Sequence, residues 1–266
     1  MNSLFLSYSG IKRYGFTEDE GCPYSYYLFY DQRLRPKWSN ARNFFVGAVG
    51  HNCVERWIKE GKLQEGYMQT IKKEEWDKFL AKNRIVYRDV DDRDVLWNRV
   101  CEYLDLIEKG FYKANLHEMG IIAEQPLKAW VKDWRVWLYS RPDIIDTDSK
   151  DMYDLKVTKT KRYFDRRQGV FTFLVHYILK GSIPKTFYQF VPLIPENLIP
   201  YEISKEEVTD LLKQVREVVK KIYARDFAPR PSSSNCYMCK MSEFCEHAYV
   251  RKPKPVKTSK DGKAVL

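Results

Sequence analysis

The sequence predicts a fold of the α/β or α+β class, and three observations support it. Apolar residues recur at three- and four-residue spacing through most of residues 1–110, which is the period of an amphipathic helix. From residue 121 the chain is rich in β-branched and aromatic residues that stand between short polar turns. Helix-like and strand-like stretches then alternate, so we expect a sheet with helices packed on it.

The predicted elements follow in order along the chain. Helices are predicted over residues 22–33, 40–61, 74–110, 167–180 and 205–224. Strands are predicted over residues 121–131, 134–146, 151–159 and 185–194, the first three as an antiparallel meander. Ser204 is followed three residues later by Glu207, a capping-box pattern that marks the start of the last helix.

Composition and charge narrow the class of protein. The 266 residues are 44% hydrophobic and 15% aromatic, enough for a sizeable core. There are 46 Lys and Arg against 36 Asp and Glu, and the net charge of +10 favours a polyanionic partner such as nucleic acid. The chain has no apolar run of about 18 residues, and its first apolar stretch is too short for a signal peptide. We therefore expect a cytoplasmic protein without a membrane partner.

Three charged residues stand on two neighbouring predicted strands. In a strand, residues two apart face the same side, so Asp154 and Lys156 should project together. Antiparallel pairing with the preceding strand would bring Asp143 close to Asp154. Two such carboxylates repel each other unless a cation such as Mg²⁺ or Mn²⁺ lies between them, and Lys156 could then orient a water or stabilise charge on a phosphate. The alternative is an exposed hairpin with solvated charges.

A histidine upstream adds to this group. In "GAVGHNCVE", Gly47, His51 and Glu55 are four residues apart and share one face of the predicted helix. Gly47 leaves room for another backbone to approach, and His51 can offer a neutral nitrogen to a metal ion. A lone histidine on such a helix is more often a hydrogen-bonded core residue. The acidic pair makes a metal site the better interpretation.

Taken together, these motifs resemble the PD-(D/E)xK nuclease superfamily. Within it, they resemble the RecB-like branch, which includes the AddB nuclease and CRISPR-associated exonucleases with an iron–sulfur cluster. The matching segments are "GAVGH" at 47–51, "RPD" at 141–143, "DLK" at 154–156, and Gln168 on the next helix. The resemblance implies a restriction-endonuclease-like core, with a mixed central sheet flanked by helices.

The resemblance also implies roles for the residues of these motifs. His51, Asp143 and Asp154 would be ligands of Mg²⁺ or Mn²⁺, and the Leu155 carbonyl would be a backbone ligand. Lys156 would be the catalytic lysine. These assignments agree with the charge pattern described above.

Two further positions of the family pattern are matched and one is not. Gln168 would position DNA or the lysine, and Glu124 matches a frequent acidic position. Thr172 stands where the family often has a tyrosine, and Tyr177 and Tyr188 are candidates to replace it.

Three cysteines within ten residues form a ligand-like cluster. Cys236, Cys239 and Cys245 have a spacing that is typical of a metal site in an intracellular protein. A zinc ion would use these three cysteines and His247. An iron–sulfur cluster would take Cys22 as its fourth ligand. The spacing alone leaves both alternatives open.

The resemblance favours the iron–sulfur alternative. The RecB-like branch has one cysteine ahead of the nuclease motifs, followed by proline and aromatic residues, as in "GCPYSYYL" around Cys22. It has three more cysteines after the motifs, which here are Cys236, Cys239 and Cys245. We therefore expect a 4Fe–4S cluster that joins distant parts of the chain and stabilises the fold.

The expected organisation is a single nuclease domain over residues 1–250. Its expected parts are a helical part at 1–118, a nuclease core at 119–225 and a cysteine cluster at 232–247 joined to Cys22. Residues 251–266 are expected to be a disordered basic tail.

The function that the resemblance implies is a Mg²⁺- or Mn²⁺-dependent deoxyribonuclease, an exonuclease on single-stranded DNA. A second hypothesis is a DNA-binding or processing subunit of a recombination or CRISPR-adaptation complex with little activity alone. A third is a zinc-binding nucleic-acid protein. The chain lacks a "GxxxxGK[ST]" motif, so a helicase, recombination or integrase partner would have to open a duplex. The sequence leaves four points open: the polarity of cleavage, exonuclease or endonuclease action, the oligomeric state, and the pathway, which could be recombination, repair or a phage process.

Overall fold

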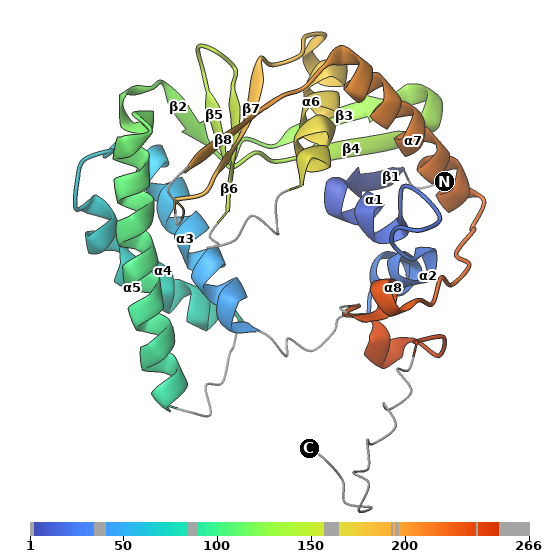
Figure 1. Cartoon of the computed structure of the whole chain (residues 1–266), viewed down its shortest axis with the longest axis horizontal. Coiled ribbons are helices and arrows are strands. Elements are labelled where there is room, and N and C mark those ends of the chain that lie inside the picture. Colours follow the sequence, from blue (N-terminus) through green and yellow to red (C-terminus); the bar gives the residue numbers. More distant parts are fainter. Residues whose placement is uncertain are drawn as a thin grey trace, which may run out of the picture. The chain divides into compact units, whose positions relative to one another are not determined.

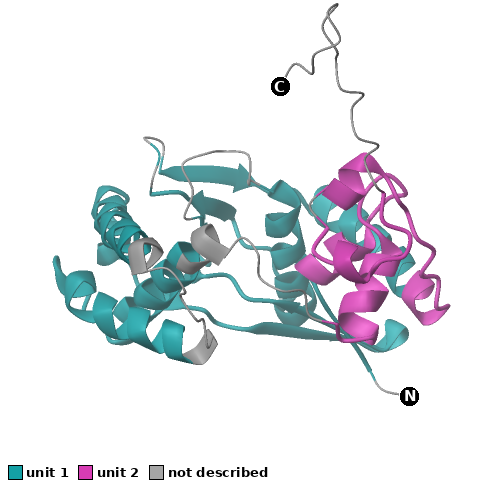
Figure 2. Ribbon diagram, turned by 90° about the horizontal axis from the view of Figure 1, so that it is seen from below, with its two compact units in different colours: residues 1–8, 38–219 teal, residues 9–37, 220–266 magenta. Residues whose placement is uncertain are grey.

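A computed structural model describes residues 3–34, 41–83, 90–156, 165–192, 194, 197–237 and 239–249. The chain divides into two compact units (Figure 2). Unit 1 contains residues 1–8 and 38–219, and unit 2 contains residues 9–37 and 220–266. The predicted helical part and nuclease core fall largely in unit 1, whereas the four predicted cluster cysteines fall in unit 2. The predicted tail at 251–266 lies outside the described residues.

Unit 1 contains two sheets (Figure 1). One is a five-stranded sheet of order β2-β5-β6-β7-β8, formed by Ile121–Ala123, Ile144–Asp146, Met152–Leu155, Thr186–Phe190 and Leu198–Glu202. The other is a three-stranded sheet of order β1-β4-β3, formed by Leu4–Ser7, Val136–Ser140 and Leu127–Val131. Each sheet has one parallel pair, β6 with β7 and β1 with β4, and is otherwise antiparallel. The mixed α/β class predicted from the sequence is confirmed.

The structure differs from the predicted meander, because two predicted strands each divide between the two sheets. The stretch 121–131 breaks into β2 and β3, and 134–146 breaks into β4 and β5. Glu124 has a left-handed φ of 45°, which turns the chain out of the first sheet. Pro126 and Pro142 lack a backbone N–H, so the ladders cannot run on through them.

Helices cover the strands of unit 1. Helix α6 (Arg166–Lys180) connects the parallel strands β6 and β7 and packs on β3 and β4. On the five-stranded sheet, α3 (Ala41–Lys59) packs on β2. It forms a core with α4 (Tyr67–Asn83) and α5 (Val90–Lys113). The predicted helix 74–110 is thus two helices, and residues 84–89 between them lie outside the described part. Helices α3, α4 and α5 lie together in Figure 1.

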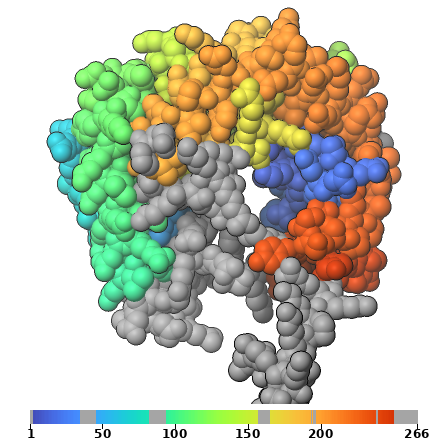
Figure 3. Space-filling view, in the orientation of Figure 1, coloured from blue at the N-terminus to red at the C-terminus, as the bar shows by residue number. Residues whose placement is uncertain are grey.

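The last helix of unit 1 begins as its sequence predicts. Helix α7 (Lys205–Tyr223) starts after Ser204, whose hydroxyl accepts a hydrogen bond from the Glu207 N–H at 3.2 Å. In return, the Ser204 N–H donates to the Glu207 carboxylate at 2.9 Å. The capping box is therefore confirmed. Both α5 and α7 lie at the surface in Figure 3.

Two segments far apart in the sequence form unit 2. The first carries most of α1 (Tyr8–Tyr14), α2 (Pro23–Tyr26) and a π-helical turn (Tyr27–Asp31), and the second carries the end of α7, α8 (Ser233–Tyr237) and a 3₁₀ turn (Ser242–Phe244). The Tyr14 hydroxyl donates to the Asp226 carbonyl at 2.6 Å, and Arg225 pairs with Asp31 at 2.9 Å. Burial, followed by the Asp226 carboxylate, raises the pKa of Tyr14 to about 12. None of the helices among the described residues has the length and apolar character needed to cross a membrane.

Close packing of α6 on β7 depends on Gly169. A Cβ atom at this position would lie 2.5 Å from the Phe187 ring. We expect Gly169→Ala to lower the free energy of unfolding by about 1–3 kcal/mol, since overpacking forces side chains and backbone to shift. A matched control is Gly47→Ala in α3, where an added Cβ meets no described atom within 4 Å. Urea unfolding compares the two, and a Gly169→Ala protein as stable as the control would contradict the packing argument.

Candidate active site

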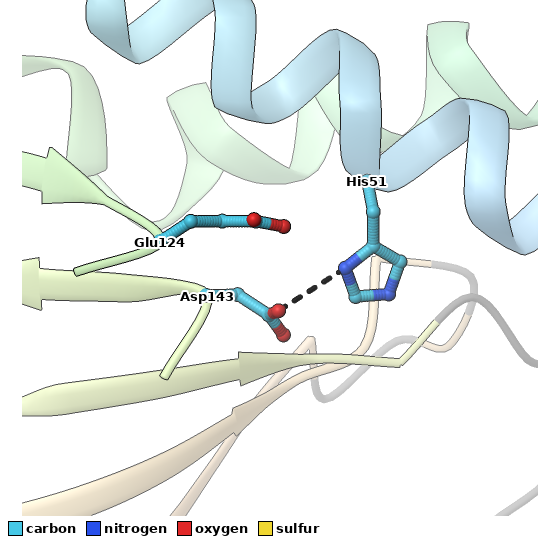
Figure 4. A group of neighbouring side chains, drawn as sticks. All are labelled: His51, Glu124 and Asp143. Atoms are coloured by element: carbon cyan, nitrogen blue, oxygen red, sulfur yellow. Dashed lines mark ion pairs between the residues drawn. The ribbon is translucent and has the colours of Figure 1, made fainter. Parts of the chain in front are cut away.

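Three side chains from different elements of unit 1 converge at one end of the five-stranded sheet (Figure 4). His51 projects from α3, Glu124 follows β2, and Asp143 precedes β5. One ligand atom from each lies within 4.8 Å of the other two. The closest pair is His51 Nδ1 and Asp143 Oδ1, 3.2 Å apart. The predicted ligands His51 and Asp143 and the predicted acidic residue Glu124 are thus neighbours.

Backbone hydrogen bonds fix Asp143 and the chain at Glu124. The Glu124 N–H donates to the Asp143 carbonyl at 2.8 Å, and the left-handed Glu124 backbone makes this bond at the point where β2 ends. The Leu155 N–H donates to Asp143 Oδ2 at 2.7 Å. Asp143 is therefore held from both neighbouring strands, and Leu155 lies next to it as predicted.

A second group of predicted residues lies where β6 meets α6. Lys156 Nζ is 2.7 Å from Asp154 Oδ2 and donates to Gln168 Oε1 at 3.1 Å. The Gln168 amide nitrogen donates to Asp154 Oδ1 at 2.7 Å. The three side chains form a closed network in which glutamine aligns both the carboxylate and the ammonium group.

The electrostatics of the first group follow from burial and from the contact between its members. Burial lowers the pKa of His51, but the Asp143 carboxylate more than offsets this, so the pKa lies above its ordinary value. Burial raises the pKa of Asp143, whereas His51 and the Leu155 N–H lower it, and the lowering prevails. Asp143 is thus ionised at neutral pH.

The other two carboxylates bind protons more readily. Burial raises the pKa of Asp154 to about 6, although Lys156 acts against this and Asp143 adds to it. Burial also raises the pKa of Glu124, while the Arg141 guanidinium at 2.9 Å opposes the rise. Burial is the main cause of both shifts, and neighbouring carboxylates add to each of them, so a bound cation would favour the ionised forms.

The tyrosine candidates are not placed alike. Thr172 is buried and bonds to the Gln168 carbonyl and to Ser140, so it supports α6. Tyr188 stacks on Tyr153 at 4.9 Å, on the face of the sheet opposite Asp154. Tyr177 lies on α6 with 37% of its surface exposed.

Sequence reasoning missed Gln189 and Tyr201 on the Asp154 face. Gln189 is the register partner of Asp154 and is fully buried, and Tyr201 donates to its oxygen at 3.0 Å. Asp154 also contributes to a raised pKa of Tyr201, for which burial is the main cause. The signal was a glutamine in the middle of the apolar strand "TFYQF".

Comparison with known proteins decides the family. A family model described as the PD-(D/E)XK nuclease superfamily matches residues 6–246. The chain belongs to this superfamily. The nuclease is also similar to the crystal structure of a "Putative exonuclease" from Eubacterium rectale, with 15% identity, a TM-score of 0.59, and coverage of 95% of this chain and 91% of that chain. That likeness supports the fold.

A second solved structure is only weakly similar, and the curated proteins give no match. The solved structure of SSO0001 is 12% identical to the nuclease, covers 60% of this chain and 79% of that chain, and has a TM-score of 0.36. No curated protein matches the nuclease.

This candidate site suits a divalent cation. Its donors are one imidazole nitrogen and several carboxylate oxygens, which Mg²⁺ and Mn²⁺ accept. Asp154 Oδ2 is buried, and the Lys156 ammonium group lies 2.7 Å from it. A carboxylate oxygen has lone pairs for more than one partner, so this oxygen can also bind a divalent cation.

Binding of Mn²⁺ to the nuclease should weaken as the solution is acidified. Below about pH 6, Asp154 takes up a proton, and a metal ion must displace that proton to bind. Protonation of His51, whose pKa lies above its ordinary value, acts in the same direction. We expect the Mn²⁺ affinity to fall at least about tenfold per pH unit below 6, as measured by calorimetry. Asp154→Asn removes one of the two titrating groups and should make the profile less steep, leaving the part that is due to His51. An equally strong dependence in that variant would assign it to other groups.

The four cysteines predicted as cluster ligands meet in unit 2 of the nuclease. A small cavity of about 20 Å³ is lined by all four, which are Cys22, Cys236, Cys239 and Cys245, and by the alternative ligand His247. Backbone N–H groups point at two of the sulfurs, from Arg230 to Cys22 and from Tyr249 to Cys236, each at 3.4 Å. Burial, with the neighbouring thiols, raises the pKa of Cys245. The cavity therefore brings together sulfurs that a bound cation would stabilise as thiolates.

Proposed function

We propose that the chain is a Mg²⁺- or Mn²⁺-dependent deoxyribonuclease that acts as an exonuclease on single-stranded DNA. One observation carries the proposal. The His51, Glu124 and Asp143 group stands beside the Asp154, Lys156 and Gln168 network, in a member of a nuclease superfamily. The description of the similar Eubacterium rectale protein as an exonuclease supports the mode of action.

Each side chain has a proposed task. His51, Asp143 and Asp154 would hold the metal, with the Leu155 carbonyl as a further ligand, and Glu124 would complete the acidic group. A bound divalent cation would polarise the scissile phosphate and favour a hydroxide-like water as attacking group. Asp143 is ionised and fixed by His51 and the Leu155 N–H, so it is ready to bind a cation without rearrangement.

Lys156 is proposed as the catalytic lysine. Its ammonium group lies between Asp154 and Gln168, with 22% of the side chain exposed, so it can reach a substrate from a fixed position. From there it can orient the attacking water or stabilise the negative charge that builds on the phosphate. Gln168 is proposed as a positioning residue, because it holds Lys156 through its oxygen and Asp154 through its nitrogen.

A structural 4Fe–4S cluster is proposed for unit 2. Zinc would hold four ligand atoms about 3.8 Å from one another. Among the described residues, no three of the cysteine and His247 ligand atoms lie within 4.8 Å of each other. His247 also packs edge-on against Tyr24, and its Nε2 lies 3.3 Å from Glu246. The four cysteines that line one cavity and the N–H groups aimed at two of their sulfurs support a four-thiolate cluster.

The proposal extends to partners and place of action. Single-stranded DNA is the proposed substrate in the cytoplasm, with a helicase, recombination or integrase protein where a duplex must be opened. The net charge of +10 supports binding of a polyanion.

A cleavage assay with anaerobically purified protein tests the proposal. The substrates are end-labelled linear single strands, linear duplexes and a circular single strand, each with Mg²⁺, Mn²⁺ or EDTA. We expect stepwise shortening of the linear single strand with either metal, no reaction in EDTA, and survival of the circle. Cutting of the circle would show an endonuclease. No cleavage by folded, iron-loaded protein would instead favour a DNA-binding subunit that needs a partner.

A further inference from the structure

Large aromatic side chains form a row on the outward face of the three-stranded sheet. The register places Phe5 of β1 beside Trp137 of β4, and Trp137 beside Trp130 of β3. Their exposed fractions are 51%, 36% and 39%. The ring centroids of Trp130 and Trp137 are 5.2 Å apart. The next row across the sheet pairs Tyr139 of β4 with Lys128 of β3. The ring centroids of Phe5 and Tyr139 are 5.4 Å apart. We call Phe5, Trp130, Trp137 and Tyr139 the aromatic face.

The aromatic face does not serve the core beneath it. Side chains alternate along a strand, and the intervening residues Leu6, Ala129 and Leu138 are almost fully buried on the side that α6 covers. The aromatic rings lie on the opposite side of the sheet and leave a contiguous apolar surface open to solvent. Patches of this kind mark binding surfaces.

A groove connects the aromatic face to the active site. It has a volume of about 440 Å³, and it is lined by Glu124 and Arg141 and also by Lys128, Tyr139 and Phe5. Arg141 contacts the Glu124 carboxylate at 2.9 Å. The face thus continues into the group proposed to bind the metal.

Basic side chains accompany the rings along the groove. Lys59 and Glu55 of α3, which form an ion pair, line it, as do Arg141 and Lys128. Lys128 stands in the row next to the two tryptophans and has no ion-pair partner within the described ranges. A polymer that offers flat apolar rings and regularly spaced negative charges would match this surface in shape and charge.

We propose that the aromatic face is a stacking platform for the bases of the DNA single strand whose scissile phosphate lies at the active site. The inference rests on the proposed nuclease function. Unpaired bases stack on aromatic rings whatever their sequence, and the backbone phosphates would meet Lys128 and Arg141. A duplex keeps its base faces stacked internally, so the platform explains a preference for single strands.

Strand geometry sets the length of DNA that the platform would engage. Trp137 precedes Asp143 by six residues, at most roughly 20 Å of extended chain. At about 3.4 Å per stacked nucleotide this corresponds to at most about six nucleotides. Oligonucleotides shorter than this would engage the active site without filling the platform.

The test compares the binding of fluorescent dT12 and of a blunt 12-base-pair duplex by anisotropy, with Ca²⁺ in place of Mg²⁺. The variants are Trp130→Ala, Trp137→Ala and the double variant, and Trp130→Phe and Trp137→Phe are matched controls that keep a ring. We expect each alanine substitution to weaken dT12 binding about five- to 100-fold. Duplex binding should change much less, and the phenylalanine variants should bind dT12 within about threefold of the unchanged protein.

A second readout separates this inference from the proposed function. Bis(4-nitrophenyl) phosphate is a small phosphodiester without bases, and its hydrolysis with Mn²⁺ reports the active site alone. The ratio of dT12 cleavage to diester hydrolysis should fall about five- to 100-fold in the alanine variants. If the unchanged protein hydrolyses neither substrate, the proposed function fails. If it cleaves dT12 and the alanine variants bind and cleave as well as it does, the stacking platform is wrong and the nuclease stands.

Two further outcomes are informative. Light scattering of each variant shows whether the substitutions dissociate an oligomer, which would mean that a second copy covers the face and would overturn the inference. Lys128→Glu leaves the rings intact and guards against misfolding of the tryptophan variants. It should weaken dT12 binding and lower its salt dependence, and unchanged binding in this variant would remove Lys128 from the platform.

Discussion

Replacement of Lys156 by alanine is expected to lower DNA cleavage about 100- to 10,000-fold, the usual cost of removing a positioned proton donor or acceptor. Lys156 is held between Asp154 at 2.7 Å and Gln168 at 3.1 Å, so few other groups can replace its charge. Single-turnover cleavage of end-labelled single strands with Mn²⁺ gives the rate. Removing the ammonium group should also raise the pKa of Asp154, because Lys156 holds that pKa down.

The controls for Lys156 separate chemistry from charge. Lys213→Ala removes a surface lysine of α7 that pairs with Asp210, and cleavage should change less than about twofold. Gln168→Ala should lower cleavage about 10- to 100-fold, as supporting residues of metal sites do. Near-normal cleavage by Lys156→Ala at saturating metal would show that another group assists the water.

Replacement of Cys236 or Cys22 by alanine is expected to destabilise the protein by on the order of 3–5 kcal/mol, comparable with losing a disulfide from a small domain. These cysteines line one cavity of unit 2, and a bound cluster would crosslink its two chain segments. The protein purified anaerobically should be brown, and both variants should lose colour and iron. Thermal unfolding followed by circular dichroism measures the loss.

Cys101→Ala provides the matched control. This cysteine lies on α5 in unit 1, outside the cavity, so colour and iron content should not change. A colourless protein with stoichiometric zinc would reject the cluster and favour the set that includes His247. Equal stability of Cys236→Ala and the unchanged protein would show that the thiols hold no structural metal.

Local sequence patterns predicted the elements whose causes are local. The capping box at Ser204 and Glu207 and the helices α3 and α6 depend on residues close in sequence. No local pattern predicts the edge strand β1, because it pairs in parallel with β4, which lies more than 100 residues further along the chain, and no turn joins the two strands. Apolar periodicity likewise could not show that 121–131 serves two sheets.

The candidate site was predictable only in part for the same reason. Asp154 and Lys156 are two residues apart on one strand, so alternation alone brings them to one side. The contact between His51 and Asp143 joins a helix to a strand end and could be reached only through a family resemblance. Gln189 and Tyr201 belong to strands placed beside β6 by tertiary packing, which the sequence does not state.

Unit 2 is built from two segments that the ribosome makes at different times. Residues 9–37 emerge early, but their partners begin at residue 220. At 5–20 residues per second, the roughly 200 intervening residues keep Cys22 waiting for about 10–40 s. Most of unit 1 is translated during that interval, whereas the cavity that the four cysteines line can form only once the second segment has been translated. Metal loading would then be a late step of biogenesis, and chains that stop before residue 236 would lack three of the four proposed cluster ligands.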